Sequence, residues 1–372
     1  MRSTMHAKRL HLLVPFALPA AVHADALLRD LERPGLEKLL QRATVTEREH
    51  GADFQRTLPH ERWLARRFGV VDGTQTDSAP LAPYMLLADG GTPGTENWAC
   101  IEPVHIQIAR DHLVLVDPGS LALSSEDAAL LLAQARPLIE ELGLTLSAPD
   151  PLRWYVHGSA LGTVAGASPL RASGRSIEIW LPHDMQAGQT AADVGSKEAK
   201  RSTFWMKLQN EVQMSWFEHP VHDNRAALGL QPANSIWLHS QGKLVPVKRA
   251  FDSVFSAQPA TRGLGLAGNA HNALRPTRLA ELPATVLAAT TLVELDTLTL
   301  PFLHEDWYEW RNALGSLEQD WFAPAVDALE AGQLDAVALT LCGETHSLTL
   351  TTTRGDLRKF WRRRAFVSLA TE

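Results

Sequence analysis

The segment HPVHDNRAALGLQPANSIWLHSQG, residues His219–Gly242, is the most informative stretch of this 372-residue chain. It joins a polar Asp223-Asn224-Arg225 cluster to a Pro-Ala-Asn-Ser step, a short apolar strand and a Gln-Gly turn. A long helix is predicted just before it, over about residues 200–217, so helix and strand alternate here as in α/β proteins. Segments that only fill a core rarely contain so many side-chain donors. The segment therefore carries both a fold signal and candidate functional residues.

The polar cluster has two interpretations that the sequence leaves open. An arginine fork such as Arg225 binds a carboxylate or phosphate bidentately, and Asn234 and Trp237 would then line the same small-anion pocket. Asp and Asn are also the usual turn formers, so Asp223 and Asn224 fit a helix cap followed by a pinned loop equally well.

Metal binding is not predicted in this segment. His219 and His222 are separated by Pro220, and the sequence places no third ligand beside them.

Composition describes an ordinary globular protein. Apolar residues make up 45% of the chain and charged residues 21%, and the net charge is −7. This balance argues against a general nucleic-acid binder. No apolar run reaches the roughly 18 residues that a membrane span needs. The last 20 residues differ from the rest, because they would place six basic side chains on one helix face: Arg354, Arg358, Lys359, Arg362, Arg363 and Arg364.

Two further features bear on location. Cys100 and Cys342 both lie in apolar, strand-like runs, which favours two buried thiols over a disulfide framework. Lys8-Arg9 followed by an apolar stretch to Val22 imitates a signal peptide. Prolines interrupt this stretch, and Leu12-Leu13-Val14 also fits a first buried strand. We therefore expect a cytoplasmic protein.

Strands and helices alternate along the whole chain, which predicts an α/β fold with a mostly parallel central sheet and an inserted, hairpin-bearing subdomain. We assign residues 1–95 and 200–372 to the α/β core and 96–199 to the inserted α+β subdomain. A β-hairpin is expected over 99–117 with its turn near Arg110-Asp111, a capped helix after Ser124, and loops over 72–96 and 184–198.

Other candidate residues lie outside the first segment. His112 follows the predicted hairpin turn and could pair with Asp111. Gln209 and Glu211 belong to a polar run that fits either a buried network facing a ligand or a solvated helix face. Glu294 and Asp296 end an apolar strand, where α/β folds tend to place functional carboxylates.

These residues resemble a known family pattern. The order Asp223-Asn-Arg…Gly229…Pro232-Ala-Asn-Ser-Ile-Trp-Leu…Gln241-Gly-Lys is similar to a segment of archaeal-type cofactor-independent phosphoglycerate mutases, which belong to the alkaline-phosphatase superfamily. Arg262-Gly263-Leu-Gly265…Gly268 resembles the next part of that pattern. End to end, the chain more closely resembles bacterial RpfE-type regulatory proteins, through Pro59-His-Glu-Arg62, Gln209-Asn-Glu211 and His219-Pro220. The resemblance implies an alkaline-phosphatase-like fold and a link to the regulation of virulence-factor production.

The chain departs from the mutase pattern at the catalytic positions. Pro15-Phe16 stands where the superfamily has a metal-binding Asp, and Pro59-His60-Glu61-Arg62 where the mutases have a Ser nucleophile. Gly343-Glu344 replaces a late Asp-His pair. Asp296 and His304 are the candidates left for a ligand set, and two ligands cannot form a two-metal site. We therefore predict no metal and no cofactor.

Three hypotheses follow. The first is a degenerate mutase-like protein with a regulatory or small-anion-binding role, whose site residues would be Asp223, Asn224, Arg225, Asn234, Trp237, Gln209 and Glu211. The second is an active phosphomutase- or phosphatase-like enzyme on a small phosphorylated or carboxylated metabolite, with His60, Glu61 or His112 as acid or base and Arg225 as anion clamp. The third is a scaffold that binds a protein partner through the basic C-terminal helix. We expect no general nucleic-acid binding and no membrane association.

Overall fold

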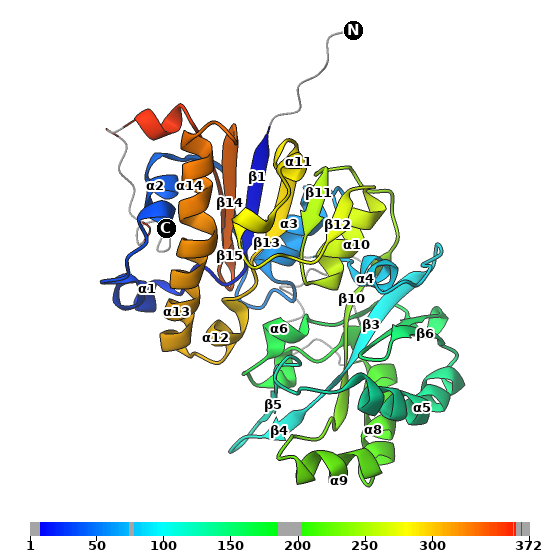
Figure 1. Ribbon diagram of the computed structural model, residues 1–372. Coiled ribbons are helices and arrows are strands. Elements are labelled where there is room, and N and C mark those ends of the chain that lie inside the picture. Colours follow the sequence, from blue (N-terminus) through cyan, green and yellow to red (C-terminus); the bar gives the residue numbers. More distant parts are fainter. Residues whose placement is uncertain (1–7, 74–77, 185–201, 360, 362–365, 367–372) are drawn as a thin grey trace. The chain divides into compact units, whose positions relative to one another are not determined.

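The computed structural model describes residues 8–73, 78–184, 202–359, 361 and 366. Contacts divide the chain into two compact units (Figure 1). Unit 1 consists of Met1–Gly51 and Val247–Glu372, and unit 2 is the intervening Ala52–Pro246. One unit is therefore inserted into the other along the sequence.

Unit 1 contains a seven-stranded sheet in the order β12-β11-β13-β1-β14-β15-β2. The first five strands in this order run parallel, and β15 and β2 are antiparallel to their neighbours. The strands are β1 (Arg9–Val14), β2 (Thr44–His50), β11 (Ser253–Phe255), β12 (His271–Ala273), β13 (Thr290–Glu294), β14 (Ala336–Cys342) and β15 (His346–Thr353).

Strand β1 has parallel neighbours on both sides, β13 and β14. Its sequence RLHLLV is buried from its second residue onward. A parallel strand buried on both faces requires such a nearly continuous apolar run. The predicted first buried strand is confirmed.

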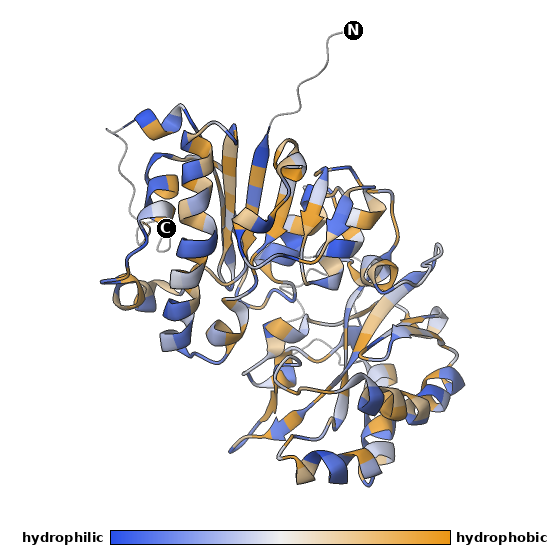
Figure 2. Cartoon of the chain, in the orientation of Figure 1, coloured by the Kyte–Doolittle hydropathy of each residue, from blue (hydrophilic) through white to orange (hydrophobic). Residues whose placement is uncertain are grey.

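Helices of unit 1 cover the sheet, and their apolar faces share one core with it. Trp310, Leu314 and Trp321 contribute to this core from helices, and Leu12 and Leu339 contribute from strands. Figure 2 shows apolar residues along the strands and mixed polar and apolar residues on the helices. The helices are α1 (Ala21–Leu28), α2 (Pro34–Arg42), α10 (Pro259–Ala267), α11 (Ala284–Leu287), α12 (Thr299–Leu303), α13 (Trp307–Leu317) and α14 (Ala323–Glu330), with short turns η3 (Leu279–Glu281), η4 (Glu318–Phe322) and η5 (Asp356–Arg358).

Unit 2 is built on a four-stranded antiparallel sheet in the order β10-β3-β7-β6. Two small hairpins, β4–β5 and β8–β9, accompany it. The strands are β3 (Asn97–Val104), β4 (Ile106–Ile108), β5 (Leu113–Leu115), β6 (Thr145–Asp150), β7 (Arg153–His157), β8 (Val164–Ala165), β9 (His183–Asp184) and β10 (Ser235–Lys243).

Two long helices pack against this sheet through an apolar core of their own. Ser124 caps the first of them, since its side chain accepts from the backbone N–H of Asp127 as the capping-box spacing predicted. The second buries Leu208, Val212 and Trp216 at helical spacing. The helices of unit 2 are α3 (Pro59–Arg67), α4 (Ala82–Ala88), α5 (Ser125–Glu141), α6 (Pro169–Ala172), α8 (Thr203–Trp216) and α9 (Pro220–Ala227), with turns η1 (Ser159–Leu161) and η2 (Ile177–Ile179).

The predicted fold class is confirmed: the chain is a mixed α/β protein with a large, mostly parallel sheet flanked by helices. The compact inserted unit reaches beyond the predicted 96–199 on both sides, because α3 and α4 before it and α8, α9 and β10 after it belong to unit 2. The prediction of a loop throughout 72–96 was wrong, since α4 forms within it.

Two other predictions changed in detail. The expected hairpin over 99–117 is split, because β3 joins the four-stranded sheet while β4 and β5 form a hairpin closed by Ala109 and His112. The expected connection over 184–198 and the basic residues Arg362–Arg364 lie outside the described residues, apart from Asp184 in β9. In the described parts of the chain, no helix is long and apolar enough to cross a membrane.

Candidate functional site

The carboxyl ends of parallel strands β1, β11 and β13 meet at one edge of the unit 1 sheet. Leu13 lies beside Glu294, and Phe255 beside Val293, in the strand register. Functional side chains of α/β proteins gather at this kind of edge, where loops leave the strands. The polar residues that follow these strands therefore form the candidate site.

Glu294 is the central ionisable group of this edge. It is 2% exposed, and the Ser256 hydroxyl donates to its Oε2 at 2.6 Å. Burial raises the pKa of Glu294 to about 7, although the hydrogen bond from Ser256 acts in the opposite direction. The charge of Asp296 raises it further. A carboxyl group that titrates near neutral pH can hold or release a proton under ordinary conditions.

Asp296 lies two residues beyond the end of β13, and two side chains donate to its carboxylate. Gln258 Nε2 donates to its Oδ2 at 2.6 Å, and an Arg275 terminal nitrogen approaches its Oδ1 at 3.3 Å. The Nε atom of Arg275 is buried and has no hydrogen-bond partner. Arg275 is therefore a guanidinium with donor capacity left over.

Ser256 also organises the start of α10. Its Oγ accepts from the backbone N–H of Gln258 at 2.8 Å, directly before Pro259 begins the helix. The serine is completely buried. The Ser256–Glu294 pair has the distance of a nucleophile and its base, but the hydroxyl already has two partners and no exposed surface.

Apolar residues occupy the end of β1. Phe16 is 1% exposed, its ring centroid lies 5.0 Å from that of Phe302, and its carbonyl accepts from Trp310 Nε1 at 3.0 Å. Its φ of 56° turns the chain sharply after the strand.

The end of β14 is also tightly packed. A Cβ on Gly343 would lie 2.8 Å from the carbonyl oxygen of Leu18, so a residue with a side chain does not fit there without movement.

Arg225, the predicted anion clamp, is 1% exposed in unit 2. Its three nitrogen atoms donate to the carbonyls of Gln231 (2.9 Å), Ala122 (3.3 Å) and Leu121 (2.5 Å), and Asp127 lies 3.4 Å away. The guanidinium thus ties the end of α9 to the segment before α5. These contacts do not support its predicted role as a ligand clamp.

The other buried candidates also bind the protein itself. Asn234 forms two hydrogen bonds with the backbone of Ile106, at 2.8 and 2.9 Å. Trp237 Nε1 donates to the carbonyl of Ala167. Gln209 donates to Ser235 Oγ at 3.0 Å, which fits the buried-network alternative for this residue, with strand β10 and not a ligand as its partner.

Three other candidates are exposed or partly exposed. Asp223 and Asn224 are exposed on α9, and Glu211 pairs with Lys207 at 3.7 Å on α8. The solvated-face alternative therefore describes Glu211 better than the buried network does.

The predicted catalytic residues have different local partners. His112 Nδ1 lies 2.8 Å from Asp111, as expected, on the exposed turn of the β4–β5 hairpin. His60 is buried in the first turn of α3, and Glu61 accepts from the backbone N–H of Leu58 at 2.7 Å, which caps that helix. None of the described contacts joins His112 to Arg225. The contacts described for these residues therefore do not assemble an acid–base pair with an anion clamp.

The weak metal candidates remain separate as well. His304 ends α12 and is exposed, whereas Asp296 is engaged by Gln258 and Arg275. Within the described residues, the one group of three or more side chains that could hold a metal is Cys100, Glu102 and His239 in unit 2. Sequence reasoning missed this group because Cys100 and His239 meet only through the pairing of β3 with β10.

Solved structures similar to this chain include the two that follow. No family model and no curated protein matches the chain. A cofactor-independent phosphoglycerate mutase from Thermoplasma acidophilum DSM 1728 is 15% identical, with 98% of this chain and 95% of that chain covered and a TM-score of 0.47. The PH0037 protein from Pyrococcus horikoshii is 11% identical, with 94% and 88% covered and a TM-score of 0.48.

Proposed function

We propose that this chain is a degenerate phosphoglycerate-mutase-like protein of the RpfE type, which acts in regulation by binding a small anion and does not transfer phosphoryl groups. The motif resemblance within residues 219–268 supports the alkaline-phosphatase-like ancestry. The observation that carries the proposal is the end of β1, where buried Phe16 packs against Phe302. The resemblance assigns this place to the superfamily's metal-binding Asp.

The remaining positions do not fit a two-metal site either. Such a site needs several oxygen and nitrogen ligands around two ions that lie about 3.5–4 Å apart. At the edge of the sheet, Glu294 and Asp296 are engaged by Ser256, Gln258 and Arg275. Of the pair Gly343-Glu344, which replaces the late Asp-His pair, Gly343 offers no side chain for a ligand. No step through a bound metal is therefore proposed for this edge.

The nucleophile position supports the same conclusion. Pro59 begins helix α3 there, and the Glu61 carboxylate accepts a hydrogen bond from the backbone N–H of Leu58. These side chains stabilise the start of a helix, so the proposal assigns them no chemistry.

Arg275 is the group proposed to receive the anion. Its side chain is 18% exposed, its Nε has no hydrogen-bond partner, and its contacts to Asp296 and the Pro276 carbonyl are long, at 3.3 and 3.4 Å. A guanidinium with unused donors binds carboxylate or phosphate well.

Calorimetry and activity assays on the full chain test this proposal. We expect 3-phosphoglycerate or inorganic phosphate to bind without turnover in mutase and phosphatase assays that contain Mn²⁺ or Mg²⁺. Arg275→Gln should weaken binding at least tenfold, because the bidentate partner is lost. Arg278→Gln removes an exposed arginine and should leave binding unchanged. Metal-dependent mutase turnover would refute the degenerate assignment, and equal binding by both variants would refute the anion site.

An active enzyme is the alternative, and the Ser256–Glu294 pair is the observation that favours it. A serine 2.6 Å from a carboxylate with a pKa of about 7 could act as a nucleophile with its base. Burial of both residues argues against it. A screen with phosphate and carboxylate esters decides between the two: turnover that Ser256→Ala abolishes would establish the enzyme.

A cytoplasmic location is part of the proposal. The stretch that imitates a signal peptide includes β1, which lies between β13 and β14 in the sheet. Cleavage after Ala24 would remove this strand, so we propose that residues 9–14 are retained in the folded protein.

A further inference from the structure

Three metal-ligating side chains meet on one face of the unit 2 sheet, far from the candidate site of unit 1 in the sequence. Cys100 and Glu102 are two residues apart on β3, so both point to the same face. His239 on β10 is the direct antiparallel partner of Cys100. The thiol sulfur, a carboxylate oxygen and an imidazole nitrogen all lie within 4.8 Å of one another.

The histidine has an unused nitrogen that faces this group. His239 is 5% exposed, and its Nε2 is buried without a hydrogen-bond partner, 3.5 Å from Glu102 Oε1. Its Nδ1 lies 2.8 Å from the Ser240 hydroxyl. Histidines that bind metals typically use one ring nitrogen for the ion and hold the other with a hydrogen bond of this kind.

The backbone of β10 is shaped to hold the histidine there. The strand register shifts between His239 and Gly242, and Ser240 has a φ of 60°. A Cβ on Gly242 would lie 2.0 Å from Pro80 Cβ, so glycine is required at this bulge. β-Bulges often redirect a side chain beside a functional site.

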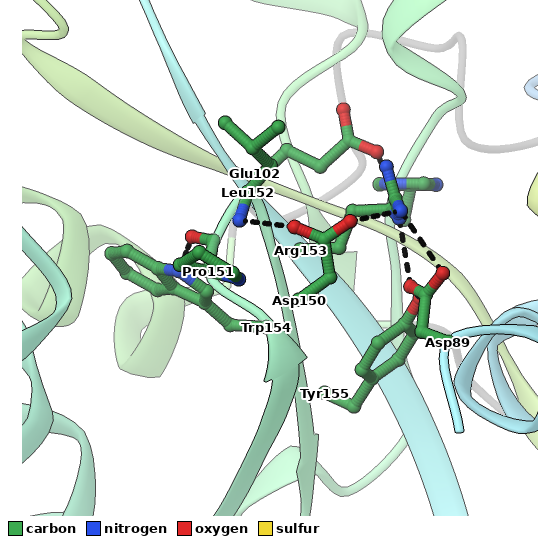
Figure 3. Close-up of polar contacts among 9 residues, drawn as sticks. Asp89, Glu102, Asp150, Pro151, Leu152, Arg153, Trp154 and Tyr155 are labelled. Atoms are coloured by element: carbon green, nitrogen blue, oxygen red, sulfur yellow. Dashed lines mark hydrogen bonds and ion pairs between the residues drawn. The ribbon is translucent and has the colours of Figure 1, made fainter. Parts of the chain in front are cut away.

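The surrounding charges favour a cation. The charged groups around Cys100 include three carboxylates, Glu102, Asp89 and Asp150, and one guanidinium, Arg153. Figure 3 shows Arg153 between Asp89 and Asp150, with Glu102 nearby. Arg153 binds Asp89 at 2.8 and 3.0 Å and Asp150 at 2.5 Å. The carboxylates outnumber the guanidinium, so the net charge around Cys100 is negative. A cation bound by the three ligands would reduce this negative charge.

We propose that Cys100, Glu102 and His239 bind one zinc ion and leave a fourth position for water. Zinc prefers this mixture of thiolate, imidazole and carboxylate ligands. Tetrahedral zinc bonds place ligand atoms roughly 3.3–3.6 Å apart, so the observed separations close with small side-chain rotations. The Glu102 side chain is 18% exposed, so the proposed site reaches solvent at this ligand. The proposal concerns unit 2 and does not depend on the function proposed for unit 1.

Cobalt titration of the full-length protein tests the site, after the protein has been stripped with a chelator. We expect one Co²⁺ per chain, a thiolate-to-cobalt charge-transfer band in the near ultraviolet, and displacement by Zn²⁺. Cys100→Ser should remove the band. Cys342→Ser changes the other buried cysteine, in unit 1, and should keep it. Glu102→Gln should keep the band and weaken affinity tenfold or more.

Two results would overturn the proposal. One is wild-type protein that takes up no cobalt or shows no thiolate band. The other is a band that survives in Cys100→Ser or disappears in Cys342→Ser. Near-ultraviolet circular dichroism checks that the variants fold, and the wild-type titration is decisive even where a variant does not.

Discussion

The role of a single residue in this protein depends on its contacts and cannot be inferred from the type of its side chain alone. Arg225 has the chemistry of an anion clamp, yet carbonyl groups occupy its guanidinium in the core of unit 2. Arg56 is used in the same way, with donors to the carbonyls of Trp180, Ile179 and Leu181. Burial lowers the pKa of Arg56 to about 10. Buried polar atoms must find partners, and irregular loops supply unpaired carbonyls.

Glu294 gives a prediction for pH dependence. Its folded-state pKa of about 7 is above the ordinary 4.5, so folding favours the protonated form. The stabilisation this provides is fully present below about pH 4.5 and is lost as the pH rises through 7. Between pH 5 and 8, the unfolding free energy of the wild type should fall by about 2.5 kcal/mol relative to Glu294→Gln. Urea unfolding across this range measures it. Glu309→Gln, on an exposed helix face, should behave as the wild type, and parallel curves for wild type and Glu294→Gln would refute the assignment.

A few side chains connect separate helices by accepting hydrogen bonds from the free backbone N–H groups at a helix N-terminus. Glu318, 6% exposed at the start of η4, accepts from the backbone N–H groups of Gly35 and Leu36 at 2.6 and 2.9 Å. It therefore caps the N-terminus of α2 from another part of the chain. A Cβ on Gly35 would lie 2.6 Å from the backbone of Ala323, so this close packing needs glycine.

Replacing this cap gives the second prediction. Glu318→Ala leaves two buried backbone donors without partners, and charged hydrogen bonds of this kind contribute about 2–3 kcal/mol to stability. We expect a loss of that size in urea unfolding. Glu330→Ala removes an exposed carboxylate that also contacts α2, through Lys38, and should cost under about 1 kcal/mol. Equal losses in both variants would show that the buried cap has no special role.

At the scale of the whole molecule, two units with separate cores share one chain. The core of unit 2 draws on α5, α8, β3, β7 and β10, which span more than the predicted 96–199 insertion. Its sheet would lose an edge strand without β10.

The third prediction concerns this boundary. A fragment of residues 52–246 should fold cooperatively, because it includes every strand and helix of unit 2. A fragment of 96–199 lacks β10 and α8 and should remain unfolded. Near-ultraviolet circular dichroism and thermal unfolding distinguish the two. A stable 96–199 fragment would restore the narrower boundary.

The sequence by itself determined the fold class, because apolar periodicity and capping signals are local: β1, the Ser124 cap and the buried stripe of α8 all follow from neighbouring residues. It did not determine the candidate sites. The Glu294 cluster depends on parallel strands that bring Ser256, Gln258 and Arg275 together, and the Cys100–Glu102–His239 group depends on the pairing of β3 with β10. Only the tertiary structure decided these contacts, since register and burial across distant strands fix which side chains meet and which pKa values shift.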